Sequence, residues 1–391
     1  MTLPELGVGI VGFGWMGQVH ARALTRLLQH YPDTPLRPRL VAVADTATDG
    51  RTQRAVASYG VEHRLEDWRE LVSRADIDLV CVTGPNYLHR DVAVGAAEHG
   101  KHVWVEKPAG RTSAETQQIA DAVDAAGVRS ATGFNYRNAP AVEQARELVA
   151  SGRLGRLEHT TVRFCSDYSA HPEGALTWRF QNEYAGSGVL GDLVSHATDL
   201  ARFVVGDLDE LVVDTATFID ERPAVVGAAS HFTRGGGQLR PVENEDYVCA
   251  LLRFVDGSRG LLESSRVAVG DQNAYTIDVH GTRGALSWDF RRMGELRVCL
   301  DQDFQDASYA TQHVTTSYGD LQAFQPGAGI AMSFDDLKVV EAHRLVQSIA
   351  SGSQVGATIH DALVAAHTVD AMQQSVVSRR WVRVPRRGDR G

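Results

Sequence analysis

In roughly the first third of the chain, short apolar runs alternate with longer segments whose apolar residues recur every three or four positions. Short, almost wholly apolar runs are typical of buried parallel strands, and the longer period indicates helices between them. The sequence therefore predicts an α/β domain with a parallel sheet. The expected strands are LGVGIVG, RLVAVAD, DLVCVTG, HVWVEK and VRSATGF, and the expected helices cover residues 16–29, 53–59, 68–75, 90–98 and 114–125.

The pattern changes after Phe134. A helix that ends at Ser151-Gly152 is followed by longer stretches in which β-branched and polar residues alternate, as in strands with one exposed face. These stretches predict an α+β domain with a large, open and mostly antiparallel sheet. We therefore expect a first domain over residues 1–134 and a second domain over residues 135–391. The expected strands lie in LEHTTVRFC, VVDTATFI, YVCALLRFV, SRGLLESSRV, YTIDVHG and LRVCL.

The rest of the second domain is less regular. Residues 221–245 and 302–331 show no clear period, and loops of that length are usually lids or subunit contacts. Two late helices are expected, one with Val339 and Ala342 on its apolar stripe and one over residues 360–378. The arginine-rich end SRRWVRVPRRGDRG is expected to be a last strand and a solvated tail, with polyanion binding as the alternative.

The composition and net charge limit the classes of molecule that the protein is expected to bind. Apolar residues make up 43% of the chain and charged residues 23%, as in ordinary folded domains, and the formal charge is −10. This charge disfavours nucleic acid and anionic membranes as partners. The N-terminus shows no basic leader, and no apolar run approaches membrane-spanning length, so we expect a cytoplasmic protein.

Cysteine and histidine positions do not indicate a metal site. The four cysteines lie far apart without a C-x-x-C pair, which predicts reduced thiols and neither a disulfide framework nor a zinc site. No cluster of histidines, cysteines and carboxylates has the spacing of transition-metal ligands. We therefore expect chemistry without a metal.

A glycine motif, GFGWMG, lies between the first predicted strand and the first predicted helix and matches G-x-G-x-x-G. The first glycine permits a tight turn, the second lets the backbone approach a pyrophosphate, and the third lets helix and strand pack closely. The motif predicts a Rossmann-type dinucleotide site, the alternative being a glycine-rich turn without ligand. The expected cofactor contacts are Gly12, Phe13, Gly14, Trp15, Met16 and Gly17.

Asp45 ends the second predicted strand, where a carboxylate can accept hydrogen bonds from both adenosine ribose hydroxyls. It would repel a 2′-phosphate, so we expect NAD, with NADP less favoured. Arg51 could soften this preference. A plain turn aspartate is the alternative.

The stretch GSGVLGDLVSHATDL places Asp192, His196 and Asp199 in an otherwise apolar run. If the run is helical, these spacings put all three side chains on one face. Asp192 and His196 then form either an orienting acid with a proton carrier or a buried salt bridge. Asp199 is expected to be structural, paired with Arg202 or with a neighbouring strand.

A third motif, Glu106-Lys107-Pro108, follows the fourth apolar run. Together with the glycine motif, Pro85-Asn86 with His89, and the segment from Gly191 to His196, it resembles the Gfo/Idh/MocA family, which includes glucose-fructose oxidoreductase and inositol dehydrogenase. The segment TWRFQNEYAGSGVLGDLVSHATDLARF, with FNYRNAPAV, most resembles members that oxidise pyranose rings. The resemblance implies catalytic roles for Lys107, Asp192 and His196.

The residue types agree with these implied roles. Lys107 precedes a proline, which favours an extended backbone, and it follows a parallel strand, where such sheets bind ligands. Its charge would stabilise an alkoxide, although a surface lysine is the usual alternative. His196 titrates near neutrality as a residue type and is the candidate base, and Asp192 would orient its ring.

Further contacts are expected around these groups. An aromatic face beside hydrogen-bonding groups suits a polyhydroxylated ring, whereas two arginines could clamp a carboxylate or phosphate, and a core tryptophan remains an alternative. The other expected cofactor contacts are Thr83, Pro85, Asn86, His89, Glu106 and Lys107. The expected substrate contacts are Tyr136, Arg137, Trp178, Arg179 and Gln181, with Lys107, Asp192 and His196.

These features predict an NAD-dependent dehydrogenase that oxidises a secondary alcohol of a pyranose sugar or cyclitol to the ketone by hydride transfer. One rival is an NAD-dependent glycosidase or lyase with transient oxidation and no net NADH. Another is an NAD-sensing regulator, which would need none of the three catalytic residues. The exposed sheet face and the resemblance lead us to expect a homodimer or homotetramer.

Overall fold

The computed structural model describes residues 3–47, 50–225, 233–300 and 303–385. Contacts divide the chain into two compact units, Met1–Asn135 with Ser333–Leu363, and Tyr136–Met332 with Val364–Gly391. The first boundary lies next to the expected one at residue 134. The segment Ser333–Leu363 differs from the expectation, because it packs with the first unit and not with the second. Its polar side chains explain this, since they bond to residues of the first unit that lie more than two hundred positions away.

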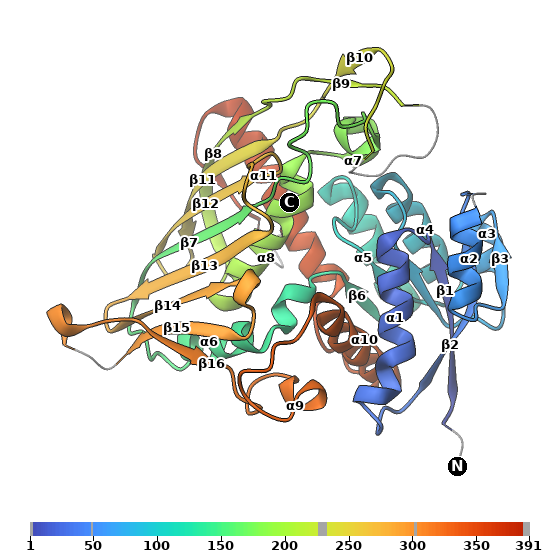
Figure 1. Ribbon diagram of the computed structural model, residues 1–391, viewed down its shortest axis with the longest axis horizontal. Coiled ribbons are helices and arrows are strands. Elements are labelled where there is room, and N and C mark those ends of the chain that lie inside the picture. Colours follow the sequence, from blue (N-terminus) through green and yellow to red (C-terminus); the bar gives the residue numbers. More distant parts are fainter. Residues whose placement is uncertain (1–2, 48–49, 226–232, 301–302, 386–391) are drawn as a thin grey trace. The chain divides into compact units, whose positions relative to one another are not determined.

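The first unit contains a parallel sheet in the order β3-β2-β1-β4-β5-β6, as the sequence predicts (Figure 1). The strand order reverses between β1 and β4, which pair with each other, and the carboxyl ends at such a reversal are where α/β sheets bind ligands. The strands are β1 (Glu5–Val11), β2 (Arg37–Ala44), β3 (His63–Leu65), β4 (Leu79–Val82), β5 (His102–Val105) and β6 (Ser130–Thr132). The helices are α1 (Trp15–His30), α2 (Gly50–Ser58), α3 (Trp68–Val72), α4 (Asn86–Glu98), α5 (Ser113–Ala126) and α10 (Phe334–Ser351).

The predicted elements of this unit agree with the structure except at a few ends. Helix α4 begins at Asn86, four residues before the predicted start, because extended Pro85 stands directly before it and the chain turns there. Strand β3 was not predicted, since its three residues are too few to show a period. The early start of α4 leaves residues 83–85 as a short turn between β4 and the helix.

The second unit contains a large mixed sheet in the order β16-β15-β14-β13-β7-β12-β11-β8-β17 (Figure 1). All neighbours in it are antiparallel except β7 and β12, which confirms the predicted mostly antiparallel sheet. Its strands are β7 (Leu157–Cys165), β8 (Leu208–Ala216), β11 (Tyr247–Phe254), β12 (Arg259–Ser265), β13 (Ala274–Gly281), β14 (Gly284–Asp289), β15 (Glu295–Leu300), β16 (Ala310–His313) and β17 (Val382–Arg383).

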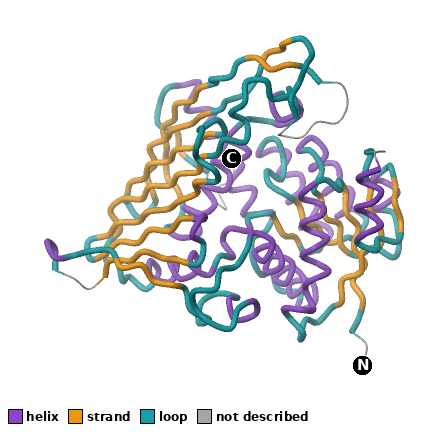
Figure 2. The backbone as a smooth tube through the Cα atoms, in the orientation of Figure 1, coloured by secondary structure: helices purple, strands orange, loops and turns teal. Residues whose placement is uncertain are grey.

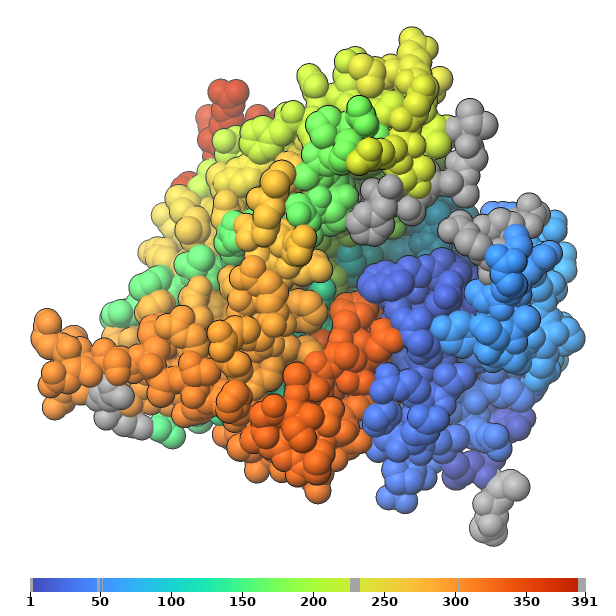
Figure 3. All heavy atoms as spheres, in the orientation of Figure 1, coloured from blue at the N-terminus to red at the C-terminus, as the bar shows by residue number. Residues whose placement is uncertain are grey.

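Helices pack on one face of this sheet (Figure 2). They are α6 (Pro140–Ala150), α8 (Ser195–Val204) and, from the end of the chain, α11 (Ile359–Ser378). Residues alternate between buried and exposed along β11 and β12, as expected for strands with one open face. The space-filling view shows the strands as adjacent bands, with green β7 between yellow and orange neighbours (Figure 3).

The two segments expected to be loops contain short elements. Residues 221–245 include the antiparallel pair β9 (Glu221–Pro223) and β10 (Leu239–Pro241), although residues 226–232 lie outside the described part. Residues 302–331 include β16 and the short helix α9 (Leu321–Phe324). The expectation of structureless loops was therefore wrong in part, because three- and four-residue elements leave no detectable period. The arginine-rich end contributes β17, and residues 386–391 of the expected tail are outside the described part.

Candidate functional site

The glycine motif forms the turn between β1 and α1. Gly12 has φ of +86°, and a Cβ there would lie 2.6 Å from Gly84 Cα. A Cβ on Gly17 would lie 2.2 Å from the carbonyl oxygen of Gly12, so both positions require glycine. A Cβ on Gly14 would meet nothing within 4 Å. The backbone at Gly14 thus faces open space at the N-terminus of α1, as a pyrophosphate site requires.

Asp45 ties the second strand to this turn. Its Oδ2 accepts a hydrogen bond from the Phe13 backbone N–H at 2.5 Å, and its Oδ1 accepts one from the Ala47 N–H at 2.7 Å. The carboxylate is half-buried at the end of β2. Asp45 is therefore placed beside the glycine turn, where the ribose prediction needs it. The side chain of Arg51 lies outside the described part.

The turn after β4 is bonded to the glycine turn and to the E-K-P motif. Thr83 Oγ1 donates to the carbonyl oxygen of Gly12 at 2.6 Å. The buried His89 ring places Nε2 2.9 Å from the Gly84 carbonyl oxygen and Nδ1 2.8 Å from that of Pro108. Burial lowers the pKa of His89. The His89 ring therefore links two turns of the first unit instead of projecting from its surface.

The carboxylate of Glu106 belongs to a buried network that includes the Lys107 backbone N–H. Its Oε1 lies 2.9 Å from His20 Nε2 and 2.5 Å from Lys338 Nζ, and its Oε2 accepts a weaker bond from the Lys107 N–H at 3.3 Å. Glu341 joins through Lys338, at 3.1 Å. The network is deeply buried, with His20 and Lys338 fully inaccessible. The carboxylate of Glu106 is thus held by protein groups inside the first unit.

The protonation of His20 gives this network a measurable pH dependence. Burial lowers the pKa of His20 from 6.5 to about 4, even though its hydrogen bond to Glu106 acts to raise it. The folded state therefore favours the neutral ring, and the resulting stability is complete above pH 6.5 and is lost as pH falls toward 4. We expect this to remove about 3 kcal/mol from the free energy of unfolding.

His20→Gln tests this expectation, because the glutamine amide can still donate to Glu106 but does not titrate. Urea unfolding at several pH values should show wild type losing stability relative to His20→Gln between pH 6.5 and 4. Parallel stability curves for the two proteins over that range would contradict it. Burial also raises the pKa of Glu341, to about 7. This carboxyl is present in both proteins, so its titration changes both stability curves equally and cancels when one curve is subtracted from the other.

In the second unit, Asp192 and His196 lie on one helical segment. It begins as a π-helical turn, η3 (Leu190–Val194), and continues as α8. Glu245 caps its start, since Oε1 accepts hydrogen bonds from the Gly188 N–H at 2.8 Å and the Leu190 N–H at 2.9 Å. The run is helical, as the prediction required, but with a π turn at Asp192, a feature that often marks functional sites.

His196 is 7% exposed and lies among aromatic rings. The centroid of its ring is 4.9 Å from that of Tyr136, which stands edge-on to it, and 6.1 Å from that of Phe164. Tyr275 donates its hydroxyl to the His196 carbonyl oxygen at 2.7 Å. The imidazole is therefore held in place by packing. Tyr136, predicted to contact substrate, lies next to it.

Asp192 has a partner that was not predicted. The hydroxyl of Tyr168 donates to Asp192 Oδ2 at 2.5 Å. Burial and the neighbouring Asp192 carboxylate raise the pKa of Tyr168 well above its ordinary value, so it remains a donor at neutral pH. Tyr168 stands in the polar stretch SDYS after β7, and no pattern in that stretch distinguishes it from a surface tyrosine.

Asp199 is structural, as expected, but its partner is Arg137 and not Arg202. Arg137 Nε donates to Asp199 Oδ2 at 2.6 Å, and a second bond joins Nη2 to Oδ1. Arg202 instead pairs with Asp207 at 2.9 Å. Arg137 is only 8% exposed, and its guanidinium lies over the Phe203 ring. The paired geometry assigns Arg137 to the interior beside α8, unlike the predicted substrate contact.

Trp178, Arg179 and Gln181 lie on or next to a short 3-10 turn, η2 (Trp178–Phe180). The Arg179 guanidinium lies 4.2 Å from the Trp178 ring centroid. Burial lowers the pKa of Arg179, and the charges of Asp192 and Tyr168 oppose this shift. Arg179 is thus within electrostatic range of Asp192, and the three predicted contacts remain on one segment.

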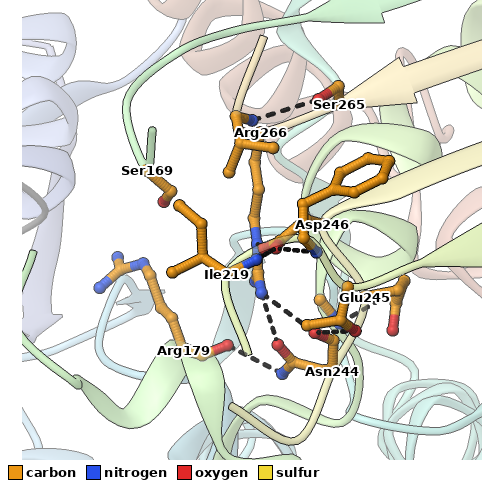
Figure 4. A network of polar contacts seen from close by, with 12 residues as sticks. Ser169, Arg179, Ile219, Asn244, Glu245, Asp246, Ser265 and Arg266 are labelled. Carbon is orange, nitrogen blue, oxygen red and sulfur yellow. Dashed lines mark hydrogen bonds and ion pairs between the residues drawn. The ribbon is translucent and has the colours of Figure 1, made fainter. Parts of the chain in front are cut away.

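A buried polar network anchors that segment (Figure 4). Asn244 Nδ2 donates to the Arg179 carbonyl oxygen at 2.9 Å, and Asn244 Oδ1 accepts from Arg266 Nη2 at 2.8 Å. Arg266 Nε donates to the fully buried Asp246 at 2.8 Å. Figure 4 shows the Arg179 guanidinium pointing away from these residues. The network thus holds the backbone of Arg179 and leaves its charged group to other contacts.

Each unit therefore assembles part of the predicted site. The first brings together the glycine turn, Asp45, Thr83 and the E-K-P motif, and the second brings Asp192 and His196 together with Tyr136 and the Trp178–Gln181 segment. Within the described residues, no group of three or more histidines, cysteines and carboxylates could hold a metal ion. No helix in the same residues has the length and apolar character needed to span a membrane.

Comparison with known proteins gives consistent matches over nearly the whole chain. Residues 6–134 match the family model for the oxidoreductase family, NAD-binding Rossmann fold, and residues 142–287 match the GFO/IDH/MocA C-terminal domain. Levoglucosan dehydrogenase of Pseudarthrobacter phenanthrenivorans is 33% identical over 98% of this chain and 99% of that protein. Inositol 2-dehydrogenase of Rhizobium meliloti is 26% identical over 89% and 98%.

Comparison with solved structures gives matches to the same kind of protein. A levoglucosan dehydrogenase in complex with NADH and levoglucosan matches with a TM-score of 0.91 and 32% identity, covering 98% of this chain and 100% of that one. The sequence matches and the fold are therefore consistent with each other. The chain belongs to the Gfo/Idh/MocA family of oxidoreductases, and its first unit is an NAD-binding Rossmann domain.

Proposed function

We propose that this protein oxidises a secondary alcohol of a pyranose sugar or cyclitol to the ketone, with NAD as the hydride acceptor. The observation that carries the proposal is one helical segment of the second unit. In it, the π turn that contains Asp192 leads directly into the helix that contains the packed His196. Relatives named for levoglucosan and inositol dehydrogenation support this substrate class.

The cofactor would be held by residues of the first unit. The open backbone at Gly14, with its neighbours Gly12 and Gly17, suits a pyrophosphate, and Asp45 beside Phe13 suits the ribose hydroxyls. Since Asp45 is acidic, we propose that NAD is preferred to NADP. Trp15, Met16, Thr83, Pro85 and Asn86 complete the proposed cofactor contacts. We assign His89 and Glu106 to holding the turns that carry these groups, because both are engaged inside the unit.

Three side chains would perform the chemistry. His196 takes the hydroxyl proton of the substrate, and Asp192 orients the imidazole and stabilises its charged form. Lys107 stabilises the developing alkoxide with its charge. NAD supplies the hydride acceptor.

The substrate contacts are Tyr136, Trp178, Arg179 and Gln181 in this proposal. An aromatic ring face suits the apolar C–H side of a sugar, and the polar groups suit its hydroxyls. We do not retain Arg137 as a substrate contact and propose a positioning role for it, since its buried bonds to Asp199 hold α8 in place. We also propose a homodimer or homotetramer through the open face of the large sheet, where Leu251 and Leu261 pair across strands and are exposed; light scattering measures this directly.

Assay of the purified protein with NAD against a panel of pyranoses, anhydrosugars and inositols tests the function. Steady accumulation of NADH with at least one sugar or cyclitol is the expected result. Cleavage of a glycoside without net NADH would replace the proposal by an NAD-dependent glycosidase or lyase. Binding of NAD with no turnover on the panel would favour a sensor.

Tyr168→Phe tests the role of the hydroxyl that holds Asp192. Removing one hydrogen bond to a charged group is expected to lower kcat by about 10- to 100-fold, because the carboxylate loses the donor that holds its orientation. The KM for NAD should change little, since Tyr168 belongs to the second unit. Tyr309→Phe, on a more exposed tyrosine, is the matched control. Equal kcat values for wild type and Tyr168→Phe would show that the bond does not serve catalysis.

A further inference from the structure

Lys338 is an unusual residue in this chain. The sequence contains three lysines, Lys101, Lys107 and Lys338, among 39 basic residues. Lys338 has no exposed surface and lies on α10, in the segment Ser333–Leu363 that packs with the first unit. A buried ammonium is costly unless it is paired and hydrogen-bonded, so this lysine requires an explanation.

The partners of Lys338 lead to the E-K-P motif. Its Nζ lies 2.5 Å from Glu106 Oε1, 3.1 Å from Glu341 Oε1 and 5.8 Å from the Trp104 ring centroid. Trp104 Nε1 donates to Glu341 Oε1 at 2.5 Å. A compact ammonium can bond both carboxylates from one atom, whereas a guanidinium presents its donors in a wider, planar fork.

We propose that Lys338 is a positioning residue for Lys107, because it holds the Glu106 carboxylate whose other oxygen binds the Lys107 peptide. The role rests on the proposed function of Lys107. Nothing else in the proposed mechanism uses Lys338.

The geometry leaves the Glu106 carboxylate little freedom. The Glu106 N–H donates to the Val82 carbonyl oxygen at 2.9 Å, which fixes the backbone at the strand end. A Cβ on Gly133 would lie 2.3 Å from Glu106 Oε2, so the carboxylate fills the space that a side chain would occupy there. His20 bonds the oxygen that Lys338 also bonds. Because Oε2 accepts a hydrogen bond from the Lys107 N–H, a shift of this carboxylate would also move the Lys107 peptide.

Electrostatics makes the arrangement depend on Lys338. Burial raises the pKa of Glu106, but the charge of Lys338 and the bond from His20 outweigh it and hold the pKa below its ordinary value. The other titratable groups that face the cluster include Glu341 from α10, Cys81 from β4 and His89 from α4. Without the Lys338 ammonium, Glu106 would keep the desolvation penalty and lose its main counter-charge.

Lys338→Met tests the proposal by kinetics. We expect kcat to fall by about 10- to 100-fold, as for a misplaced catalytic group, with the dissociation constant for NADH nearly unchanged. In a Lys107→Ala background, Lys338→Met should lower kcat by less than about twofold further, because the group it positions is absent. Equal fold losses in both backgrounds would overturn the proposal. Lys101→Met, which removes a lysine that bonds only the Arg74 carbonyl oxygen among the described contacts, is the control.

A second readout does not need the dehydrogenase activity. With so few lysines, reductive methylation with isotopically labelled formaldehyde should give NMR signals that can be assigned to Lys101 and Lys107 by substitution. Lys338→Met is expected to move the Lys107 signal and leave the Lys101 signal in place. If Lys338→Met does not fold, Glu106→Gln should move the same signal. An unmoved Lys107 signal in a folded variant would refute the positioning role, whatever the substrate panel shows about the proposed function.

Discussion

Replacing His196 by alanine should lower kcat by about 10²- to 10⁴-fold, the usual contribution of a positioned general base. In the proposed reaction, the alcohol must lose its proton as the hydride leaves, and His196 is the group assigned to take it. Its ring is packed against Tyr136 and is 7% exposed, so it is already oriented before substrate binds. NADH titration should give nearly the same dissociation constant as wild type, because the proposed cofactor contacts belong to the first unit.

His313→Ala provides the matched control, since His313 is exposed on β16 and stands outside the proposed site. Its kcat should equal that of wild type. If His196→Ala instead loses NADH affinity and turnover together, His196 is a structural histidine and the assignment of the base is wrong. Thermal unfolding of both variants separates a loss of fold from a loss of chemistry.

Replacing Asp246 by alanine is expected to lower the free energy of unfolding by about 3–5 kcal/mol, as when one partner of a buried ion pair is removed. The Asp246 carboxylate is fully buried and accepts hydrogen bonds from Arg266 Nε and from the N–H groups of Phe218 and Ile219. Alanine would leave the Arg266 guanidinium buried without its carboxylate and two backbone donors without acceptors. Urea unfolding measures the change.

In the proposed reaction the same variant should raise the KM for the sugar or cyclitol, since Arg266 holds Asn244 and Asn244 holds the backbone of Arg179, a proposed substrate contact. Asp220→Ala removes an exposed carboxylate nearby and should change stability by less than about 0.5 kcal/mol. If Asp246→Ala lowers the free energy of unfolding by less than about 1 kcal/mol, the ion pair between Asp246 and Arg266 stabilises the fold no more than a surface ion pair does. That result would also remove the proposed support of the Trp178–Gln181 segment.

Local sequence patterns were enough to predict the parts of the site that depend on backbone geometry. The glycine motif required close approach at Gly12 and Gly17 and an open backbone at Gly14, and the structure shows all three. The helical period correctly placed Asp192 and His196 on one segment. The π turn was not predictable from the spacing, and the carboxylate that accepts hydrogen bonds at the start of this segment comes from Glu245, more than fifty residues along the chain.

Pairings between distant residues were not predictable from the sequence. Arg137 stands in a polar stretch that suited a substrate contact, but its guanidinium bonds Asp199, which lies 62 residues away. Tyr168 gave no local signal, since the bond to Asp192 exists only after β7 and η3 have packed. Long polar side chains can reach many partners, and which partner they take depends on how strands and helices from distant segments meet.

By itself, the sequence determined most of the longer strands and helices and the dinucleotide motif, because each depends on residues that are neighbours in the chain. The candidate catalytic side chains came from the family resemblance of the motifs that carry them. Only the tertiary structure decided that Ser333–Leu363 packs with the first unit and that Lys338 bonds the Glu106 carboxylate. A buried lysine and a surface lysine look alike in sequence. The difference between them is the cost of desolvation, which the fold offsets by supplying Glu106 and Glu341 as partners.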